Sequence, residues 1–358
     1  MKTHEYQEMT AMPTPNAEVP ASATSLLSRR GVLAGLLGLG SGLALGATGE
    51  AWAADGIPGT GPIRLVVPYV AGGPADQVAR KIAQKLSDRL GRAMIIDNKS
   101  GAGGSVGAAY VVRAEPDGST ILYNTSTMAI DPVLRRNLPY DVLRDLTPVT
   151  TAVLGPLAIL VNPQLPVKNI AELVAYARAN PGKLNYGTAG AGSSLHMATE
   201  QFALAAGIKL VHVPYKGAGE TVVATIANDI QMVIQPMPSA LQYAKNSQQL
   251  RALAVTTARH SAIWPELPTV AESGVKGLES YDSSIWYQFY LPSKTPKAVV
   301  QALNADIRAV LKVPELEQWL QSQGMEALGD TPEQASQRLK SEIQRWAAVA
   351  RATGIRVD

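Results

Sequence analysis

The hydrophobic and polar positions along the chain alternate between short apolar runs and amphipathic stretches. The apolar run 63–67 predicts a buried strand, and the apolar residues at 78, 82, 86 and 90 have helical spacing. The same order of a strand followed by a helix recurs further along the chain. Strands are predicted at 93–96, 120–123, 184–187, 210–213, 230–234 and 250–256, and helices at 105–114, 166–179, 195–206, 220–227 and 240–245. Strands that alternate with helices over short turns indicate an α/β protein with a largely parallel sheet.

Two further apolar runs predict strands that pass between domains. The run 153–161 is broken by Gly155 and Pro156, and we interpret it as a strand that leaves the first domain. The run 283–291 alternates and is rich in aromatic residues, so it predicts a strand that returns. The segments 124–128 and 138–148 are expected to be loop, the second with a short helix. Amphipathic helices are predicted at 296–312, 314–323 and 332–352.

The first fifty residues do not continue this pattern. A polar segment, 1–27, is followed by Arg29 and Arg30 and then by an uncharged run rich in Gly and Leu. Ala51-Trp52-Ala53 has the form of a cleavage site. We therefore expect residues 1–53 to be a twin-arginine-like signal peptide, cleaved after Ala53, with export to the periplasm. An arginine pair also occurs in other secretory signals, so the export route stays open.

Composition narrows the classes of function. The 358 residues, 46% of them hydrophobic, suffice for two domains, and a net charge of +3 gives no argument for a nucleic-acid partner. No cysteine is present, which excludes disulfides and thiolate metal ligands. Gly101–Gly104 lacks the third glycine of a dinucleotide-binding loop, because position 106 is Val. We expect no cofactor and no metal.

The stretch Pro68–Asp76 is a candidate anion site. It joins a strand to a helix, Gly72 and Gly73 allow a ligand to approach the backbone, and Pro74 suits the first helical position. The free amides of a first helical turn favour an anion, so we hypothesise that this turn binds a carboxylate. An ordinary strand-to-helix turn is the alternative. A second Gly-rich turn, Thr188–His196, repeats the arrangement about 120 residues later, with Ser193 or Ser194 as a good N-cap.

Individual side chains in these turns leave alternatives open. Asp76 either accepts hydrogen bonds from amides of its own first turn or contacts a ligand. His196 either packs or hydrogen-bonds within its turn, contacts a ligand, or acts in catalysis. A periplasmic serine hydrolase using Ser193 or Ser194 with His196 is the competing enzyme hypothesis, although the Gly-x-Ser-x-Gly motif is absent. An interaction protein without a small ligand is a third hypothesis. The aromatic residues that either line a cleft or belong to the core are Tyr69, Tyr215, Trp286 and Tyr287.

Several motifs in a fixed order carry a family resemblance. They are Pro68–Asp76, Asp97–Gly104, Asn185–Ser193 with His196, Val213–Gly217, Pro238–Ala240, Leu250–Val255 and Pro265–Glu272. With these motifs, essentially all of 60–358 resembles the solute-binding proteins of the tripartite tricarboxylate transporters, the Bug family.

The resemblance implies a two-lobed, type II-like periplasmic binding protein whose ligand cleft lies between lobes joined by crossing strands. It implies lobe 1 at 54–161 plus 285–358 and lobe 2 at 162–284. The implied function is non-enzymatic: a monomer captures a small organic acid and delivers it to membrane transporter subunits or to a sensor.

The resemblance also implies that the two Gly-rich turns face each other and hold a ligand carboxylate. The expected ligand-binding residues are Tyr69, Val70, Ala71, Gly72, Gly73, Asp76, Ser126, Thr127, Thr188, Ala189, Gly192, Ser193, Ser194, His196, Tyr215 and Gln235. The chain departs from the family pattern at Gln235, where the family often has Asp. A neutral amide there predicts a carboxylate ligand without a cationic group. Tyr69 replaces a usual Phe and adds a hydroxyl to the cleft wall.

Overall fold

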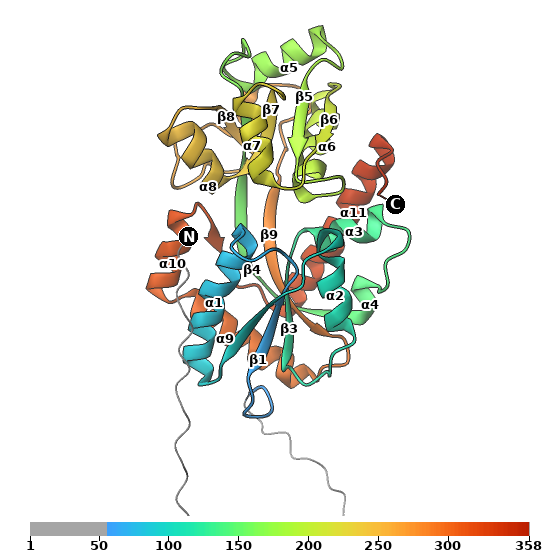
Figure 1. Ribbon diagram of the computed structural model, residues 1–358, viewed down its shortest axis with the longest axis vertical. Coiled ribbons are helices and arrows are strands. Elements are labelled where there is room, and N and C mark those ends of the chain that lie inside the picture. Colours follow the sequence, from blue (N-terminus) through green and yellow to red (C-terminus); the bar gives the residue numbers. More distant parts are fainter. Residues whose placement is uncertain (1–55, 358) are drawn as a thin grey trace, which may run out of the picture. The chain divides into compact units, whose positions relative to one another are not determined.

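The computed structural model describes residues 56–357. The expected signal peptide, 1–53, lies outside the described residues. The described chain forms an α/β protein of two lobes, each with its own part of the sheet (Figure 1). The strand order across the sheet is β2-β1-β3-β9-β4-β7-β5-β6, and β8 and β10 both pair with β4.

Lobe 1 is built on parallel strands with two antiparallel partners, β9 and the short β10. Strand β1 pairs in parallel with β2 and β3, and β9 pairs antiparallel with β3 and β4. The strands are β1 (Ile63–Val67), β2 (Met94–Asn98), β3 (Thr120–Thr125), β4 (Leu146–Val161), β9 (Ser284–Pro292) and β10 (Glu326–Ala327). The helices are α1 (Pro74–Leu90), α2 (Ser105–Val112), α3 (Thr127–Leu134), α4 (Val142–Asp145), α9 (Lys297–Leu311), α10 (Pro314–Ser322) and α11 (Pro332–Thr353).

Lobe 2 has a smaller sheet with the same local order of strand and helix. Strand β5 pairs in parallel with β6 and β7, while β7 and β8 pair antiparallel with β4. The strands are β5 (Asn185–Thr188), β6 (Val211–Pro214), β7 (Met232–Pro236) and β8 (Arg251–Val255). The helices are α5 (Ile170–Ala179), α6 (Ser194–Ala206), α7 (Ala218–Ile226) and α8 (Met237–Ala240), and α8 continues as a π-helical segment, Leu241–Asn246.

Strand β4 belongs to both lobes. Its residues 146–156 pair with β9, and its residues 157–161 pair with β7 and β8. Figure 1 shows β4 in green and β9 in orange running side by side between the lobes. The prediction of two lobes joined by crossing strands is therefore confirmed.

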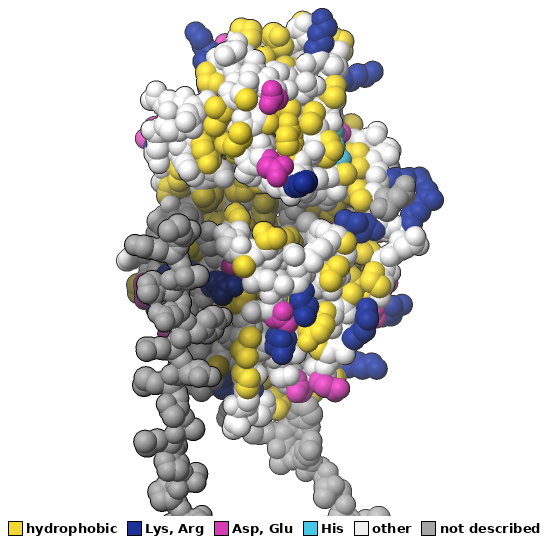
Figure 2. All heavy atoms as spheres, viewed as in Figure 1, with side chains coloured by type: hydrophobic (Ala, Val, Ile, Leu, Met, Phe, Trp, Pro, Cys, Tyr) yellow, Lys and Arg dark blue, Asp and Glu magenta, His cyan; other side chains and the backbone are white. Residues whose placement is uncertain are grey.

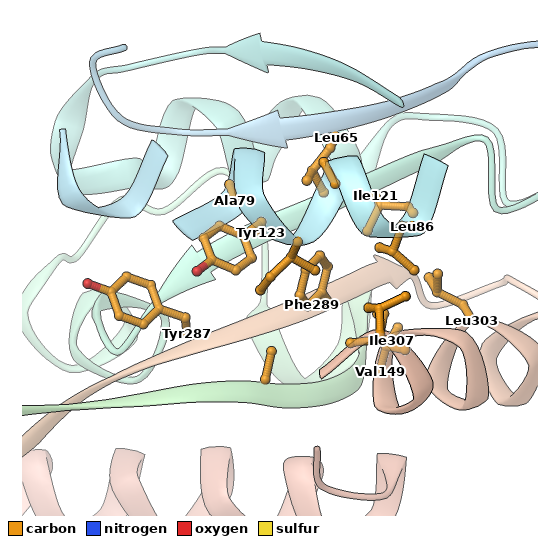
Figure 3. Close-up of a cluster of buried hydrophobic side chains, with 14 of the residues drawn as sticks. Leu65, Ala79, Leu86, Ile121, Tyr123, Val149, Tyr287, Phe289, Leu303 and Ile307 are labelled. Carbon is orange, nitrogen blue, oxygen red and sulfur yellow. The ribbon is translucent and has the colours of Figure 1, made fainter. Parts of the chain in front are cut away.

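Helix α1 positions the first Gly-rich turn by packing on the sheet of lobe 1. Its residues Val78, Ile82 and Leu86 are at most 1% exposed, and burial of each such side chain contributes about 1.5–3 kcal/mol. Figure 3 shows Leu86 and Ala79 of α1 beside Ile121 and Phe289 of the sheet, with Ile307 of α9 close by. In the same view the hydroxyl of Tyr287 points away from the other labelled side chains.

Three predicted boundaries are wrong. The helix predicted at 166–179 begins at Ile170, because Asn169 is its N-cap. Strand β4 begins at Leu146, and Gly155 and Pro156 do not interrupt it, because Pro156 lies at the end of the pairing, opposite Ser284, where the missing N–H matters least. The expected loop at 124–128 is the end of β3 followed by the start of α3. The sequence does not predict this short helix, because Pro132 lies inside it and a proline predicts a helix end.

Candidate ligand-binding site

Two Gly-rich loops occupy corresponding places in the two lobes. The first, Tyr69–Gly73, connects β1 to α1, and the second, Ala189–Ser193, connects β5 to α6. Gly72 and Gly192 have φ of 80° and 77°, left-handed conformations that glycine adopts at the least cost. Both loops therefore follow parallel strands and end at helix N-termini, as the sequence predicts.

Asp76 holds the first loop. It is the third residue of α1 and is 1% exposed, and its Oδ2 accepts hydrogen bonds from Gly72 N (2.8 Å) and Arg80 Nε (2.8 Å). Its Oδ1 accepts from Asn98 Nδ2 (2.9 Å), which also donates to Tyr69 O. Burial acts to raise the pKa of Asp76, but the hydrogen bonds from Arg80, Gly72 and Asn98 together lower it below the usual value. The carboxylate thus stays ionised and fixes the loop backbone.

His196 holds the second loop in the same way. It is the third residue of α6 and is 4% exposed, and its Nδ1 accepts a hydrogen bond from Gly192 N (3.0 Å). Ser193 is the N-cap, and its Oγ accepts from His196 N (3.2 Å). Of the roles left open by the sequence for His196, the structure shows a hydrogen bond within the turn.

A second histidine, His212, stacks on the ring of His196. The rings of His196 and His212 are stacked with centroids 4.0 Å apart, and Tyr186 stacks on His212 at 5.1 Å. His212 Nε2 lies 2.6 Å from Thr188 Oγ1, which donates to Gly190 O (3.1 Å). Burial, followed by the proximity of His212, lowers the pKa of His196 to about 4, and burial lowers the pKa of His212. Both rings are therefore neutral near neutral pH, and each holds one end of the loop.

Backbone donors remain at both helix N-termini. The amides of Gly72 and Gly73 bond to Asp76 and to Val70 O, so they are already engaged. The amides of Ala75 and Asp76 in α1, and those of Ser194 and Leu195 in α6, have no hydrogen-bond partner within residues 56–357. These first-turn N–H groups, with the helix dipoles behind them, are suited to bind an anion.

A polar cluster lies where β1 and β3 end side by side. The hydroxyl of Tyr69 contacts Asn124 Oδ1 (2.7 Å), Thr125 Oγ1 (2.6 Å) and Thr127 Oγ1 (3.0 Å). Burial raises the pKa of Tyr69 to about 12, so the phenol stays protonated. A Cβ on Gly104 would lie 3.3 Å from this hydroxyl, which explains a glycine there. The sequence prediction missed Asn124 and Thr125, although the parallel register of β1 and β3 could have indicated them.

The two lobes touch at the second loop. Ser126 Oγ, just before α3, lies 3.0 Å from Ser194 Oγ at the start of α6. A Cβ on Gly192 would lie 2.8 Å from Val357 Cγ2 and 3.3 Å from Leu134 Cδ1, both in lobe 1. The structure therefore brings the side chains of Ser126 and Ser194 together, and their contact with a ligand stays a prediction.

The other predicted site residues fall into two groups. Val70 is 68% exposed, Ala71 is exposed and Ala189 is half-buried, so all three lie at the surface of their loops. Tyr215 touches the second loop through its backbone, with its N–H donating to Thr188 O (2.9 Å).

Gln235 and the two aromatic residues of β9 are buried, and Tyr69 of the first loop packs against the core cluster that contains Tyr287. Gln235 is fully buried in β7, and its Nε2 donates to Thr221 Oγ1 (2.7 Å) and Ala218 O (3.2 Å) rather than to any other predicted site residue. Trp286 and Tyr287 are 2% and 3% exposed and belong to the core.

The geometry gives no support to a serine nucleophile. Within the described part of the chain, no serine hydroxyl lies within hydrogen-bond distance of a ring nitrogen of His196. Thr188 does contact His212, but it gives its proton to Gly190 O, so the imidazole donates to the hydroxyl and does not act as its base. A general base must accept the proton of the nucleophile.

Three further findings concern the surface, metal ligands and membrane-spanning helices. Figure 2 shows hydrophobic, basic and acidic side chains interspersed over both lobes of this face. Among residues 56–357, no group of three or more His, Asp or Glu side chains is arranged to hold a metal ion. No helix in the same range is both long and apolar enough to cross a membrane.

Comparison with known proteins identifies the family. A family profile described as tripartite tricarboxylate transporter family receptor matches residues 78–355. BugT of Bordetella pertussis is 34% identical over 298 residues, which cover 83% of this chain and 90% of BugT. A solved structure of an R. palustris protein with adipate has a TM-score of 0.75 at 34% identity, covering 83% of this chain and 98% of that one.

A second solved structure is also similar to this chain in fold. MatC from Rhodopseudomonas palustris with bound malate has a TM-score of 0.71 at 26% identity, and the match covers 80% of this chain and 98% of MatC. The family predicted from the sequence motifs is therefore confirmed, and this chain belongs to the tripartite tricarboxylate transporter family of receptors.

Proposed function

We propose that this protein is an extracytoplasmic solute-binding protein that captures a small organic carboxylate between its lobes. The observation that carries the proposal is the pair of helix N-termini, one in each lobe, whose first-turn amides at Ala75, Asp76, Ser194 and Leu195 have no partner within residues 56–357. The hydrogen bond between Ser126 of lobe 1 and Ser194 of lobe 2 supports a site shared by the two lobes. Relatives solved with adipate and malate support the same ligand class.

The chemistry of the predicted site favours an acid without a cationic group. Asp76 is the single acidic residue among the predicted site residues, and its carboxylate is engaged by Arg80, Gly72 and Asn98. Position 235 is a neutral amide whose Nε2 is engaged. A ligand ammonium would therefore find no free carboxylate among these residues, whereas a ligand carboxylate would find amide and hydroxyl donors.

The remaining parts of the proposal follow from the family. We propose that the protein is exported with cleavage of 1–53 and works as a monomer without a cofactor. It delivers its ligand to membrane transporter subunits or to a sensor. We propose lobe limits of 54–161 plus 285–358 for lobe 1 and 162–284 for lobe 2. Closure of the lobes on the ligand would be a shift in population driven by contacts that only the closed state makes.

A ligand screen with matched uncharged compounds tests the proposal. The protein is titrated with adipate, malate and other small organic acids, and with adipamide, which has the length of adipate but no charge. We expect at least one acid to raise the melting temperature, because a ligand at a hundred times its Kd stabilises the folded state by about 2.7 kcal/mol. Adipamide should give no shift. A broad screen of acids at millimolar concentration without any stabilisation would contradict the proposal.

A further inference from the structure

The two Gly-rich loops are fixed by equivalent residues of different chemistry. In each helix the third residue accepts a hydrogen bond from the glycine N–H four positions earlier, Gly72 to Asp76 in α1 (2.8 Å) and Gly192 to His196 in α6 (3.0 Å). Asp76 has a cation, Arg80, one turn further on (2.8 Å). The acceptor in lobe 2 has Glu200 at that position instead, with its Oε1 4.0 Å from His196 Nε2. The second loop is therefore held by an uncharged acceptor.

This acceptor works in one protonation state only. Because Nδ1 of His196 accepts from Gly192, the single proton of the neutral ring lies on Nε2, on the side of Glu200. A second proton would go on Nδ1 and would point at the N–H donor of Gly192. Protonation of His196 and the hydrogen bond to the loop therefore exclude each other.

The neighbours of His196 come from both lobes. Tyr186 of β5 bonds to Glu200, and His212 of β6 stacks on the imidazole. Lobe 1 contributes the apolar Leu134 and Val357, which pack on Gly192. Charged groups of the neighbouring helices include Asp131 and Arg135 of α3, ion-paired at 2.8 Å. Helix α11 carries Glu342 and Arg345, also ion-paired at 2.8 Å, and Arg351, which donates to Ala347 O (3.2 Å).

We propose that His196, with His212 stacked behind it, is the positioning residue of the second loop and holds Gly192 only as a neutral imidazole, so that acidification releases the loop. The consequence for ligand binding rests on the proposed function, since the loop carries the amides of Ser194 and Leu195. The release itself is a property of the protein without ligand.

The size of the pH effect on loop release follows from the difference between the pKa of His196 in the fixed loop and in the released loop. Burial lowers the pKa of His196 to about 4 in the fixed loop, against 6.5 for a free imidazole. Between these two values the released loop binds a proton and the fixed loop does not. The equilibrium for release should therefore shift about tenfold per pH unit across this window, in favour of release as the pH falls.

Amide exchange of the ligand-free protein tests the inference directly. The protection factor of the Gly192 amide is measured between neutral pH and pH 4 in wild type, His196→Asn and His260→Asn. We expect protection to fall about tenfold per pH unit below 6.5 in wild type. His196→Asn should be flat, because an amide oxygen accepts the same hydrogen bond without titrating. His260→Asn changes an exposed histidine paired with Glu272 and should follow wild type.

Two results would overturn the inference. One is protection in wild type that does not depend on pH. The other is an unchanged pH dependence in His196→Asn, which would assign the effect to His212, whose pKa burial lowers, or to Asp131, whose pKa burial raises to about 6. A third histidine variant, His196→Ala, removes the acceptor of the Gly192 N–H altogether. The Gly192 amide should therefore lose protection at every pH in this variant.

Adipate titrations separate this inference from the proposed function. His196→Ala should weaken adipate binding about tenfold, the cost of one hydrogen bond in the loop, and His196→Asn should recover most of the loss. Equal affinities in wild type and His196→Ala would overturn the positioning role. If wild type binds neither adipate nor any other acid, the proposed function fails, and the exchange of Gly192 still decides the role of His196.

Discussion

At the scale of single residues, each Gly-rich loop depends on one buried side chain that reaches back from the following helix. The sequence places Asp76 and His196 in first helical turns, because that pattern is local. It does not reveal that they bind Gly72 and Gly192, since this depends on the path of each loop. The sequence therefore predicts where the loops lie, and the structure shows which of their amides are already engaged.

Substitution of Asp76 measures what the first loop contributes to stability. Asp76→Ala leaves Gly72 N, Asn98 Nδ2 and Arg80 without their acceptor, and we expect a loss of about 1–3 kcal/mol in the free energy of unfolding in urea. Asp76→Asn keeps an acceptor for Gly72 and should lose less. Equal losses in the two variants would assign the effect to the charge and not to the loop.

The pH dependence of Asp76 has a definite sign. The pKa is lowered in the folded protein, so the carboxylate stabilises the fold above its ordinary pKa of 3.8, and this contribution is lost as the pH falls through the folded pKa. The difference in unfolding free energy between wild type and Asp76→Ala should therefore shrink in acid. A difference that does not change with pH would contradict the ionised state of Asp76.

At the scale of elements, local patterns predict most helices and strands, and long-range pairing decides the rest. Helix α6 ends at Ala206 and α9 spans Lys297–Leu311, close to the predictions. The start of β4 at Leu146 is not predicted, because threonines and Pro148 interrupt the apolar pattern at 147–151, and this segment becomes a strand through pairing with β9. Helix α3 is not predicted, because Asn124–Met128 has the composition of a loop and Pro132 predicts a helix end. Non-local contacts thus override local propensity at both places.

The N-terminus of α6 offers a test of the anion site within one element. Ser194 is the first residue of α6, the position that Pro74 occupies in α1, and proline there keeps the helix but removes an N–H. Ser193 has φ −66° and ψ 158°, which a following proline accepts. We expect Ser194→Pro to weaken adipate binding about tenfold or more, because a hydrogen bond to a charged group contributes about 1.5–3 kcal/mol.

Ser194→Ala is the matched control for that substitution. It removes the hydroxyl that contacts Ser126 but keeps the backbone N–H. Calorimetric titration of both variants with adipate therefore separates the amide from the hydroxyl. Affinity in Ser194→Pro equal to that in Ser194→Ala would show that this amide does not bind the acid.

At the scale of the whole described chain, the second loop of the proposed site also packs against lobe 1. Gly192 packs on Leu134 and Val357 of lobe 1, and Val357 N donates to Leu134 O (3.1 Å). These contacts join residues more than fifty positions apart, so no periodicity in the sequence indicates them. The residue at 192 is constrained twice, by its φ of 77° and by the close approach of lobe 1.

A double-mutant cycle tests whether this contact holds the lobes together when the acid is bound. Gly192→Ala adds a Cβ that would lie 2.8 Å from Val357 Cγ2, so we expect weaker adipate binding and less compaction in solution scattering. Val357→Ala removes that Cγ2, and the double variant should regain affinity, with a coupling energy of about 1 kcal/mol. Gly190→Ala is the control, because it has a strained φ of 106° but only Tyr215 O near its Cβ, at 3.8 Å. Coupling to Val357→Ala should therefore occur at 192 and not at 190; the same coupling at both positions would show backbone strain and not contact between the lobes.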